Sequence, residues 1–418
     1  MRVGVVGAGV VGMACAHSLL DVADEVVVLD AGSVGGGASA GNAGWITPTL
    51  ATPLASPGIV ATGLRSAFDP RGALVIHPSL DPTWLRWLWR FARSSRREPY
   101  RRGVRALLEL SNRTLEDLDR IRADGVEFYE GRAGLLAVAR EREGLHWFLP
   151  LFDELVKLGF PGSIEHLDGP GARELEPALG PSVGVATRLT IDRHVSPESL
   201  TSGLAGRVRE RGGEIREQTR VTALRPAGGR WVLMGDGEEL ERVDAVVVAG
   251  ALGSSALTGP LGLRLPLVGA KGYSVTVPLG EAGPRLPLYL CEPKLGTTPM
   301  PDGTRIAGFF ELGARDGAPR ASRTRQLVEE TRRYLRGGED LPIPERPGWA
   351  GLRPSTPDSL PLLGRVPGAP GVIVATGHGM LGVTLAPVTG RAVAALVRGE
   401  RPEWLAPFDP ARFTRARG

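Results

Sequence analysis

Residues 7–12 read Gly-Ala-Gly-Val-Val-Gly, a glycine turn between an apolar run at Val3–Val6 and a helix-like segment at Met13–Leu20. A second apolar run, Val26–Leu29, ends at Asp30. The order of these segments predicts a strand, a tight turn, a helix and a second strand with an acid at its tip. This is the pattern of a unit that binds an adenine dinucleotide.

The dinucleotide-binding unit needs particular residue types at particular positions, and each requirement has a physical reason. Gly7 allows the tight turn, Gly9 lets the backbone approach a pyrophosphate, and Gly12 lets the helix pack on the strand. Val10 and Val11 begin the helix, whose N-terminus faces the phosphates. Asp30 is placed to bond a ribose hydroxyl, which disfavours NADP because a 2′-phosphate prefers arginine. The unit alone leaves NAD and FAD open.

Composition places the chain among ordinary globular enzymes. Its 418 residues suffice for two or three domains, and 42% hydrophobic and 23% charged residues are typical values. The 58 glycines and 35 prolines are spread along the chain, which indicates many turns rather than a disordered tail. The formal charge of +4 leaves anionic substrates open without indicating a nucleic-acid partner.

The two cysteines and six histidines do not form a metal-binding pattern. Cys15 and Cys291 lie outside any CxxC motif, so we expect no metal and no disulfide, with Cys15 in the first helix against the sheet. The N-terminus runs directly into the first strand, and no apolar run approaches the length of a membrane span. We therefore expect a cytoplasmic protein.

The chain alternates between two predicted domains. Helix-like and strand-like segments between residues 61 and 185 indicate an insertion, and apolar runs at 244–250 and 372–376 return to the nucleotide site. The predicted ranges are 1–60, 186–265 and 346–418 for the nucleotide-binding domain, and 61–185 and 266–345 for the second domain.

Small residues follow the acidic strand in the segment Gly-Gly-Gly-Ala-Ser-Ala-Gly-Asn-Ala-Gly at 35–44. Such residues let a large cofactor lie against backbone, and Ser39 and Asn42 have side chains that bond phosphate or ring atoms. A second segment, 377–384, places a glycine turn before a helix. Its His378 is either a structural histidine, which we favour, or a proton-transfer group.

Two further segments contain charged or aromatic side chains in apolar surroundings. Arg353 lies within 349–364, Trp-Ala-Gly-Leu-Arg-Pro-Ser-Thr-Pro-Asp-Ser-Leu-Pro-Leu-Leu-Gly. An arginine fork binds a carboxylate through two parallel hydrogen bonds. The alternative is a structural ion pair with Asp358. In Gly-Ala-Lys-Gly-Tyr-Ser at 269–274, Lys271 and Tyr273 either face a cleft between domains or face solvent.

Together these segments resemble the FAD-dependent D-amino acid dehydrogenases of the D-amino acid oxidase and glycine oxidase superfamily. The matching motifs are GAGVVG with the acid at 30, ASAGNAG, AKGYS, GLRPSTPDSLPLLG and GHGMLG, in order along nearly the whole chain. The resemblance favours FAD over NAD. It implies an α/β fold, in which a Rossmann-like FAD-binding domain carries a second, α+β substrate domain built on a mixed or antiparallel sheet.

The resemblance also assigns roles to residues. Arg353 is expected to grip the substrate carboxylate, Tyr273 and Met380 to lie near the substrate, and His378 to act in catalysis if it is not structural. Met380 stands where related dehydrogenases usually carry threonine, which leaves the substrate side chain open. The expected FAD-binding residues are Gly7, Gly9, Val10, Val11, Gly12, Asp30, Ala31, Ala38, Ser39, Asn42, Ala43, Gly44, Trp45, Val221, Gly250, Gly351, Arg353, His378, Gly379, Met380, Leu381, Gly382, Val383 and Thr384.

The implied chemistry is hydride transfer from the substrate Cα to flavin N5, after which water converts the imino acid to a keto acid and ammonia. The electron acceptor is a quinone or oxygen. One alternative is a dehydrogenase of secondary amines such as hydroxyproline, proline or sarcosine. A flavin-binding subunit that is inactive alone, and an NAD-dependent dehydrogenase, are alternatives of other kinds.

The basic segment 81–105 is predicted to begin a helix at Asp81-Pro82, where the aspartate is the N-cap. Trp84, Trp87 and Phe91 recur at helical spacing, and arginines occupy another face. The pattern is typical of an amphipathic helix packed on its own domain, which we favour. It also suits a helix that lies on a membrane surface near a quinone pool.

Overall fold

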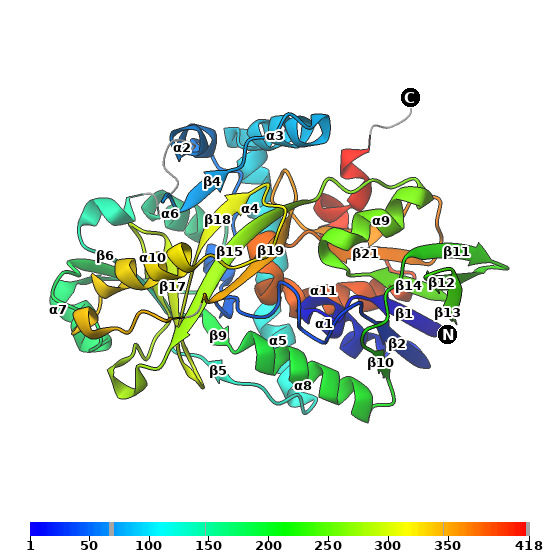
Figure 1. Cartoon of the computed structure of the whole chain (residues 1–418), viewed down its shortest axis with the longest axis horizontal. Helices are drawn as coiled ribbons and strands as arrows, with labels where there is room; N and C mark the ends of the chain where they lie inside the picture. The colour runs from blue at the N-terminus through cyan, green and yellow to red at the C-terminus, as the bar shows by residue number, and fades with distance from the viewer. Residues whose placement is uncertain (67–70, 147, 346, 415–418) are drawn as a thin grey trace.

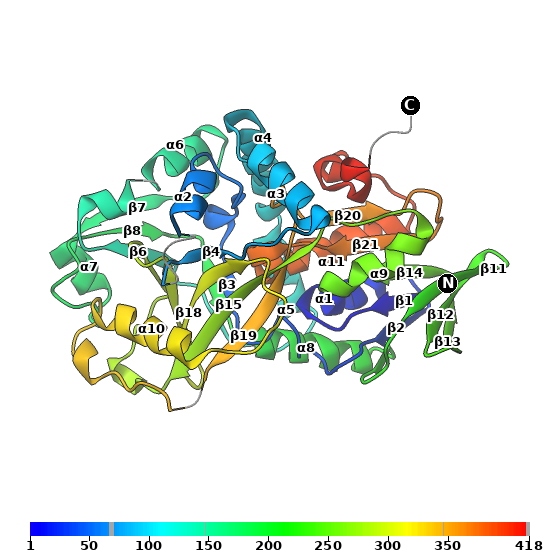
Figure 2. The same ribbon diagram turned by 45° about the horizontal axis from the view of Figure 1, so that its top comes forward.

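The computed structural model describes residues 1–66, 71–146, 148–345 and 347–414. Residues 346 and 415–418 of the predicted nucleotide-binding domain therefore lie outside the described residues. Two large sheets lie side by side, one around β1, β14 and β21 and the other around β15, β17 and β18 (Figure 1). Turning the molecule shows helices over both of them (Figure 2).

The first sheet is the predicted dinucleotide-binding sheet. Val5 pairs in parallel with Val28 on one side and with Val247 on the other. These strands are almost continuous runs of buried valines, as expected for a parallel sheet covered on both faces. In spatial order the strands are β10 (Glu214–Arg216), β2 (Glu25–Leu29), β1 (Arg2–Val6), β14 (Ala245–Val248), β21 (Val372–Thr376) and β20 (Leu362–Arg365).

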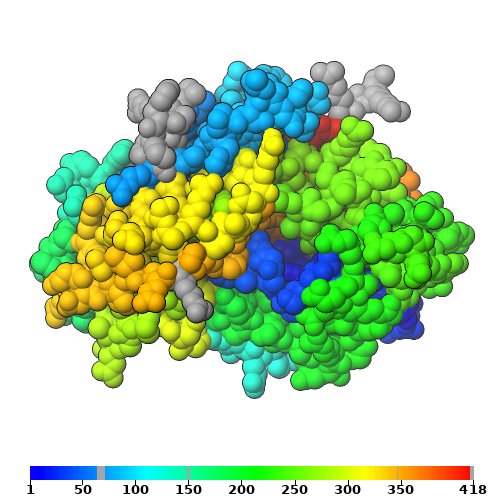
Figure 3. Space-filling model, in the orientation of Figure 1, coloured from blue at the N-terminus to red at the C-terminus, as the bar shows by residue number. Residues whose placement is uncertain are grey.

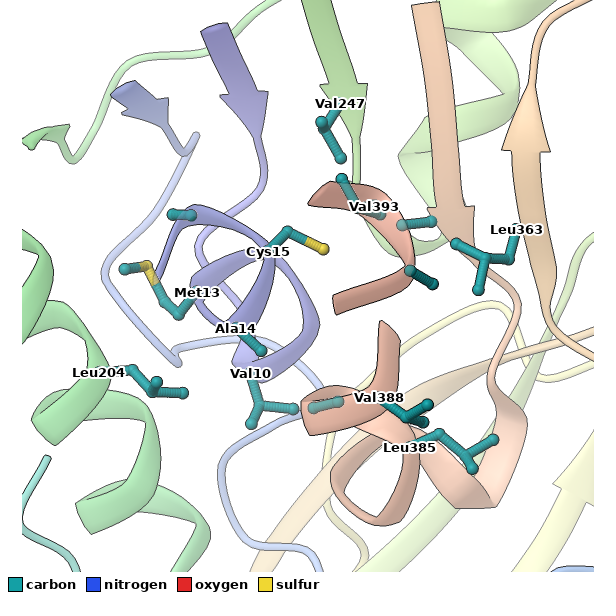
Figure 4. Packing of buried hydrophobic residues seen from close by; sticks show 14 of the residues in the cluster. Val10, Met13, Ala14, Cys15, Leu204, Val247, Leu363, Leu385, Val388 and Val393 are labelled. Carbon is teal, nitrogen blue, oxygen red and sulfur yellow. The ribbon is translucent and has the colours of Figure 1, made fainter. Parts of the chain in front are cut away.

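Helix α1 (Val10–Leu19) packs between α8 (Pro197–Glu210) and α11 (Gly382–Val397), against the sheet (Figure 4). Cys15 lies in α1 and is fully buried beside the sheet, as predicted. The two central helices approach closely, because a Cβ atom at Gly390 would lie 2.4 Å from the backbone oxygen of Ala14. The first residues of both helices, Val10 and Gly382, lie at the same end of the sheet.

The second sheet is mixed and has nine strands. Its long central strands β15 and β18 are antiparallel, with β19 on the outer edge of β15. In spatial order the strands are β19 (Trp349–Ser355), β15 (Val268–Val277), β18 (Gly303–Leu312), β17 (Leu295–Met300), β16 (Leu288–Leu290), β6 (Leu135–Ala139), β8 (Val185–Leu189) and β7 (Ile164–Asp168), while β4 (Leu74–Ile76) pairs with β18.

The remaining elements cover the sheets or form small sheets of their own. The helices are α2 (Ile59–Ser66), α3 (Pro82–Ser94), α4 (Arg97–Ser111), α5 (Thr114–Ala123), α6 (Leu149–Lys157), α7 (Gly169–Leu175), α9 (Ser254–Thr258) and α10 (Ala321–Arg332). The small sheets are β11 (Ala223–Ala227), β12 (Arg230–Gly235) and β13 (Glu238–Val243), and β3 (Trp45–Ile46), β9 (Arg193–Val195) and β5 (Glu130–Gly131).

The predicted domain boundaries differ from the structure at three points. Strands β8 and β19 fall in ranges assigned to the nucleotide-binding domain, yet both pair within the nine-stranded sheet. Helices α4 and α5 fall in the predicted insertion, yet Leu107 and Leu118 on them belong to the core around α1 and α11. The chain thus crosses between the two sheets more often than we predicted. The composition of a segment does not reveal which of the two sheets it joins.

One apolar segment contradicts the expectation that no run approaches the length of a membrane span. Gly379–Val397 is 19 residues long with a mean hydropathy of 1.6, which suffices to cross a membrane by length and composition. Of its most apolar window, 72% is buried inside the protein, where α11 packs on α1 and α5. A buried core helix has the same composition, so the segment is weak evidence for a span.

Candidate active site

A cleft of about 330 Å³ opens at the carboxyl ends of the parallel strands, where Val6, Leu29 and Ala375 line it. In Figure 3 the blue N-terminal segment is visible at the bottom of a hollow between the yellow-orange second sheet and the green segments. The crevice outside the carboxyl ends of strands is the usual ligand site of open α/β sheets. The cleft therefore lies where the sequence predicts a dinucleotide.

The turn at 7–12 packs backbone against backbone so closely that only glycine fits at two of its positions. Gly7 has φ +112°, and a Cβ atom there would lie 2.6 Å from the backbone oxygen of Ala249. A Cβ atom at Gly12 would lie 1.9 Å from the Gly7 oxygen. The turn directs the first amides of α1 at the cleft, where Val10 N donates to Ser39 Oγ at 2.9 Å.

Asp30 follows β2 and lines the same cleft. Its Oδ2 accepts from Ala8 N at 2.6 Å, and its Oδ1 accepts from Gly32 N at 2.7 Å. A carboxylate oxygen can accept two hydrogen bonds, so each oxygen of Asp30 can still accept one from a ligand hydroxyl. These two bonds fix the carboxylate at the mouth of the glycine turn.

The small-residue loop is closed by its own side chains and by a tryptophan from the second sheet. Asn42 Nδ2 donates to Ser39 O at 2.6 Å, and Asn42 Oδ1 accepts from Gly44 N at 2.7 Å. The indole of Trp349 lies against Gly41, where a Cβ atom would be 2.3 Å from the ring. The side chain of Asn42 therefore shapes the loop along the cleft.

Arg353 lies on β19, partly exposed to the cleft. Its Nη1 donates to the Phe309 carbonyl at 3.0 Å, and its guanidinium lies 5.7 Å from the Phe310 ring centre. Among the described residues, no carboxylate lies within ion-pair distance of it. Burial lowers the pKa of Arg353 to about 10, so the side chain stays charged at neutral pH.

The alternative of an ion pair between Arg353 and Asp358 is wrong. Asp358 instead receives two hydrogen bonds from Arg412, from Nε at 2.8 Å and from Nη2 at 3.0 Å. A buried cation without a carboxylate partner is costly unless a ligand supplies the anion. Arg353 is therefore the strongest anion-binding group of the cleft.

The last glycine turn joins β21 to α11 through the 3₁₀ turn η7 (Gly379–Leu381). His378 is buried, and its Nε2 lies 3.0 Å from Thr389 Oγ1 on α11. Burial lowers the pKa of His378 to about 4, so the imidazole is neutral at physiological pH. Thr384 Oγ1 donates to Trp45 O at 2.8 Å, which ties this turn to the loop at 35–47.

A small apolar recess of about 20 Å³ adjoins the cleft, with His378, Gly379 and Met380 in both linings. Met380 is 53% exposed and lines both the cleft and the recess. Apolar side chains of α3, β18 and the chain before α2 form part of the remaining wall, and hydroxyl residues form another part: Leu54, Trp87, Phe91, Phe310 and Leu312, and Thr52, Ser355, Thr356 and Ser359.

The model of the family described as FAD dependent oxidoreductase matches residues 2–396 of this chain. The chain belongs to this family. It is 35% identical over 411 residues to a D-amino acid dehydrogenase of Cereibacter sphaeroides, covering 96% of this chain and 93% of the relative. It is 32% identical over 426 residues to a D-amino acid dehydrogenase of Xanthobacter autotrophicus, with both chains fully covered.

Solved structures agree on the fold of this FAD-dependent oxidoreductase. Glycine oxidase from Geobacillus kaustophilus superposes with a TM-score of 0.76 at 23% identity, covering 100% of both chains. L-proline dehydrogenase from P. horikoshii superposes with a TM-score of 0.74 at 20% identity, covering 99% of this chain and 98% of the other. The α/β fold with a second, mixed-sheet domain is therefore confirmed.

The residues of the cleft fit FAD. The tight glycine turn, the amides at the start of α1 and the fixed Asp30 carboxylate suit its pyrophosphate and ribose. The cleft continues past these groups to Arg353 and the turn at 377–383, which suits a ligand longer than one nucleotide. The predicted residues that line it are Gly7, Gly9, Val10, Val11, Asp30, Ala31, Ala38, Ser39, Asn42, Val221, Gly250, Arg353, His378, Gly379, Met380, Gly382 and Val383.

Several predicted cofactor residues support the cleft without lining it. Gly12 packs behind the first turn, Gly351 lies under the Trp349 ring, and Trp45 Nε1 donates to Thr298 Oγ1 at 2.8 Å. The others of this kind are Ala43, Gly44, Leu381, which lines the recess, and Thr384. The cleft is also lined by residues that we did not predict from the sequence: Val6, Leu29, Ser33, Gly37, Arg220, Ala249, Ala251, Gly253, Leu257, Pro354, Ala375 and Thr376. For Val6, Leu29, Ala375 and Thr376, the position at a strand end was the available signal.

The structure does not place Tyr273 or Lys271 at the cleft, and neither of them faces solvent. Tyr273 is 1% exposed, and its hydroxyl donates to Glu311 Oε2 at 3.1 Å. Lys271 is buried and donates to Asp316 Oδ1 at 2.8 Å. Alternation along β15 turns both side chains to the face opposite Gly272, which faces Arg353; Tyr273 packs there with Leu327 and Val328 of α10. The expectation that Tyr273 lies near the substrate is wrong for this reason.

His378→Gln is expected to keep kcat within about threefold of the natural enzyme, because the amide retains a partner for Thr389 and a histidine with a pKa near 4 is too weak a base to take the amine proton. Steady-state rates across pH 6–9 check this. A loss of about 10²–10⁴-fold, with a titration limb removed from the profile, would instead establish His378 as a general acid or base.

The lowered pKa of His378 also leads us to expect that the folded protein becomes less stable in acid. The pKa of His378 is near 4 in the folded protein, against an ordinary value of 6.5. Between these pH values the residue is therefore protonated in the unfolded chain but not in the folded protein. The free energy of unfolding therefore falls as the pH drops from 6.5 to 4, by up to ~3 kcal/mol for this residue. Melting curves of the natural protein and His378→Gln should converge over that range.

Proposed function

We propose that the enzyme oxidatively deaminates D-amino acids, binding the substrate carboxylate at Arg353. The curated relatives at 32–35% identity are named D-amino acid dehydrogenases over nearly their full length. The observation that carries the proposal is the buried guanidinium of Arg353, which has no carboxylate partner among the described residues and faces the cleft that fits FAD. A substrate carboxylate supplies the missing anion.

The chain's own residues position the substrate for this reaction. Bound FAD supplies the acceptor for the hydride that leaves the substrate α-carbon, and water then converts the imino acid to a keto acid and ammonia. Arg353 fixes the carboxylate through charge-assisted hydrogen bonds, which restricts the direction of the Cα–H bond.

The cleft offers no general base to the amine. The titratable side chains that line the cleft and the recess, among the described residues, are Asp30, Arg220, Arg353 and His378. Asp30 is held by backbone amides at the nucleotide end, and His378, whose pKa burial lowers to about 4, is a weak base already bonded to Thr389. The substrate amine therefore reacts in its neutral form, after losing its proton to solvent.

The recess beside Arg353 favours a small apolar side chain on the substrate. Its volume of about 20 Å³ is close to the space of one water molecule, and its walls combine aromatic and aliphatic side chains with the hydroxyl residues Thr52, Ser355, Thr356 and Ser359, none of which carries a charge. A methyl group fits such a space, and a charged group placed there loses its hydration without gaining a partner. D-alanine is accordingly the substrate of choice for a test.

The test is anaerobic bleaching of the flavin absorption by a panel of D-alanine, other D-amino acids, glycine, sarcosine and the hydroxyprolines. We expect small apolar primary D-amino acids to bleach it fastest. Bleaching by cyclic or N-methyl amines alone would establish a secondary-amine dehydrogenase. A yellow protein that none of these substrates bleaches would contradict the proposal and favour a subunit inactive alone.

The outward face of α3 supports a second proposal, that the enzyme lies at the inner face of the cytoplasmic membrane and passes electrons to a quinone. The helix begins as predicted, since Asp81 Oδ1 accepts from Thr83 N at 2.7 Å. Its inward aromatics Trp84, Trp87 and Phe91 are buried, whereas Leu85 on the same helix is exposed. The packed amphipathic helix expected from the sequence thus has an apolar outer face as well.

That outer face has the composition of a membrane-surface element. Leu80 is 90% exposed, Trp89 61% and Leu85 46%, which are high values for large apolar side chains. Exposed arginines surround them, at positions 86, 93, 96 and 97. Apolar insertion beside cations is how peripheral helices bind anionic lipid surfaces. Trp87 and Phe91 on the inner face wall the recess, so the same helix connects this surface to the active site.

The triple variant Leu80→Ser, Leu85→Ser, Trp89→Ser is expected to bind anionic vesicles at least about tenfold more weakly than the natural protein, because each removes apolar area that enters the lipid. Sedimentation with phosphatidylglycerol-containing vesicles measures it. Val156→Ser is the matched control, since Val156 on α6 is 60% exposed elsewhere on the surface. Equal binding by the natural protein and the triple variant would refute this membrane contact.

A further inference from the structure

Phe309 adopts a backbone conformation that bulky residues rarely take. It lies inside β18 with φ +63°, in the left-handed region that favours glycine. The pairing of β15 with β18 shifts there, since Lys271 pairs with Glu311 but Tyr273 pairs with Gly308. Three residue steps on β18 thus oppose two on β15, which defines a β-bulge. Strain of this kind persists only where the surroundings enforce it, and it gathers at active sites.

The bulge supplies the protein acceptor for the carboxylate-binding arginine. The carbonyl of Phe309 accepts from Arg353 Nη1 at 3.0 Å. The guanidinium also lies flat over Gly272, where a Cβ atom would come within 2.2 Å of both terminal nitrogens. The fork is therefore fixed by a carbonyl on one side and a bare backbone on the other, which leaves its remaining N–H groups for a ligand.

The bulge is held from the opposite face of the sheet by α10. The guanidinium of Arg323 lies 4.4 Å from the centre of the buried Phe309 ring. Arg323 Nε donates to Glu311 Oε1 at 2.9 Å, and Glu311 Oε2 accepts from the Tyr273 hydroxyl at 3.1 Å. Arg323, Glu311 and Tyr273 are all at most 5% exposed, so little solvent weakens this network.

We infer that Arg323 is a positioning residue for Arg353, which acts through the Phe309 bulge across the thickness of the sheet. Its cation–π contact and its ion pair with Glu311 keep Phe309 in the left-handed conformation. That conformation directs the Phe309 carbonyl at Arg353. Without it the strand relaxes toward regular pairing, and Arg353 loses the acceptor that orients its fork. This inference rests on the proposed role of Arg353 in carboxylate binding.

The experiment titrates oxidised, FAD-loaded enzyme with propionate, the analogue of alanine that lacks the amine, and follows the flavin spectrum. Arg353→Leu is expected to weaken propionate binding about a hundredfold or more, and Arg323→Met about tenfold. Arg323→Lys retains the charge and should recover part of the loss. Arg325→Met is the matched control, since Arg325 is exposed on the same helix.

The double variant Arg323→Met, Arg353→Leu separates positioning from general destabilisation. If Arg323 acts through Arg353, the double variant binds propionate as Arg353→Leu does, because the second change has nothing left to disturb. Additive losses, or an Arg323→Met variant that binds like the natural enzyme, would overturn the inference. Propionate binding that is indifferent to Arg353→Leu would instead overturn the proposed carboxylate site, so the two failures are distinguishable.

Discussion

Arg353→Leu lowers kcat/KM for D-alanine by about 10²–10³-fold, while FAD content and melting temperature stay near those of the natural protein. Removing one partner of a desolvated, hydrogen-bonded charge pair costs about 2–5 kcal/mol, and each 1.4 kcal/mol is tenfold in binding. Stability should not suffer, because the guanidinium has no carboxylate partner among the described residues and burial already lowers its pKa. Steady-state rates over a wide range of D-alanine concentration measure the effect.

Arg353→Lys is the informative companion. Lysine keeps the charge but loses the planar fork, so we expect it to recover only part of the lost kcat/KM. A variant Arg353→Leu that remains within about threefold of the natural enzyme would show that the carboxylate binds elsewhere.

Gly12→Ala is expected to yield protein that purifies with little FAD and melts at a lower temperature. The added Cβ atom would lie 1.9 Å from the backbone oxygen of Gly7, and backbone there cannot move aside as a flexible side chain does. The helix must shift away from β1, at a cost of about 3 kcal/mol or more, and its N-terminus leaves the cleft. The ratio of flavin to protein absorbance and the melting temperature check both effects.

Gly206→Ala is the control, because it makes the same change within α8 where nothing lies within 4 Å of the new Cβ atom. It should keep FAD and gain stability by about 0.5–1 kcal/mol, as alanine does in helices. Normal FAD content in Gly12→Ala would contradict the described packing of α1 on β1.

Local patterns in the sequence predicted the nucleotide site because that site is built from consecutive residues. The glycine turn, α1 and Asp30 lie within thirty residues, and each has a steric or hydrogen-bonding requirement that its residue type reveals. The place of Cys15 in α1 and the start of α3 were predictable for the same reason. The family resemblance added FAD, which no local spacing determines.

Features set by pairing between distant strands were less predictable. Whether Tyr273 faces the cleft depends on the register of β15 in a sheet buried on both faces, and such strands lack the alternation that reveals the inward side. Asp358 pairs with Arg412 rather than Arg353, across 54 residues of chain. The bulge at Phe309 left no sequence signal, because its positive φ falls on a residue that normally avoids it.

The sequence pattern also could not predict that β8 and β19 belong to the second sheet. Both strands mix apolar and polar residues, Val-Ala-Thr-Arg-Leu in β8 and Trp-Ala-Gly-Leu-Arg-Pro-Ser in β19, and neighbouring segments of chain run to the other sheet. Only the hydrogen-bond pairing with β6 and β15 decides where they belong.

The most direct measurement is anaerobic mixing of the FAD-loaded enzyme with D-alanine and, separately, L-alanine, while the flavin absorption is recorded and released ammonia is assayed. We expect D-alanine to bleach the flavin and to yield one ammonia per flavin, L-alanine to do neither, and the Arg353→Leu variant to be bleached much more slowly at the same D-alanine concentration. A flavin that D-alanine leaves oxidised, or one bleached equally fast with and without Arg353, would contradict it.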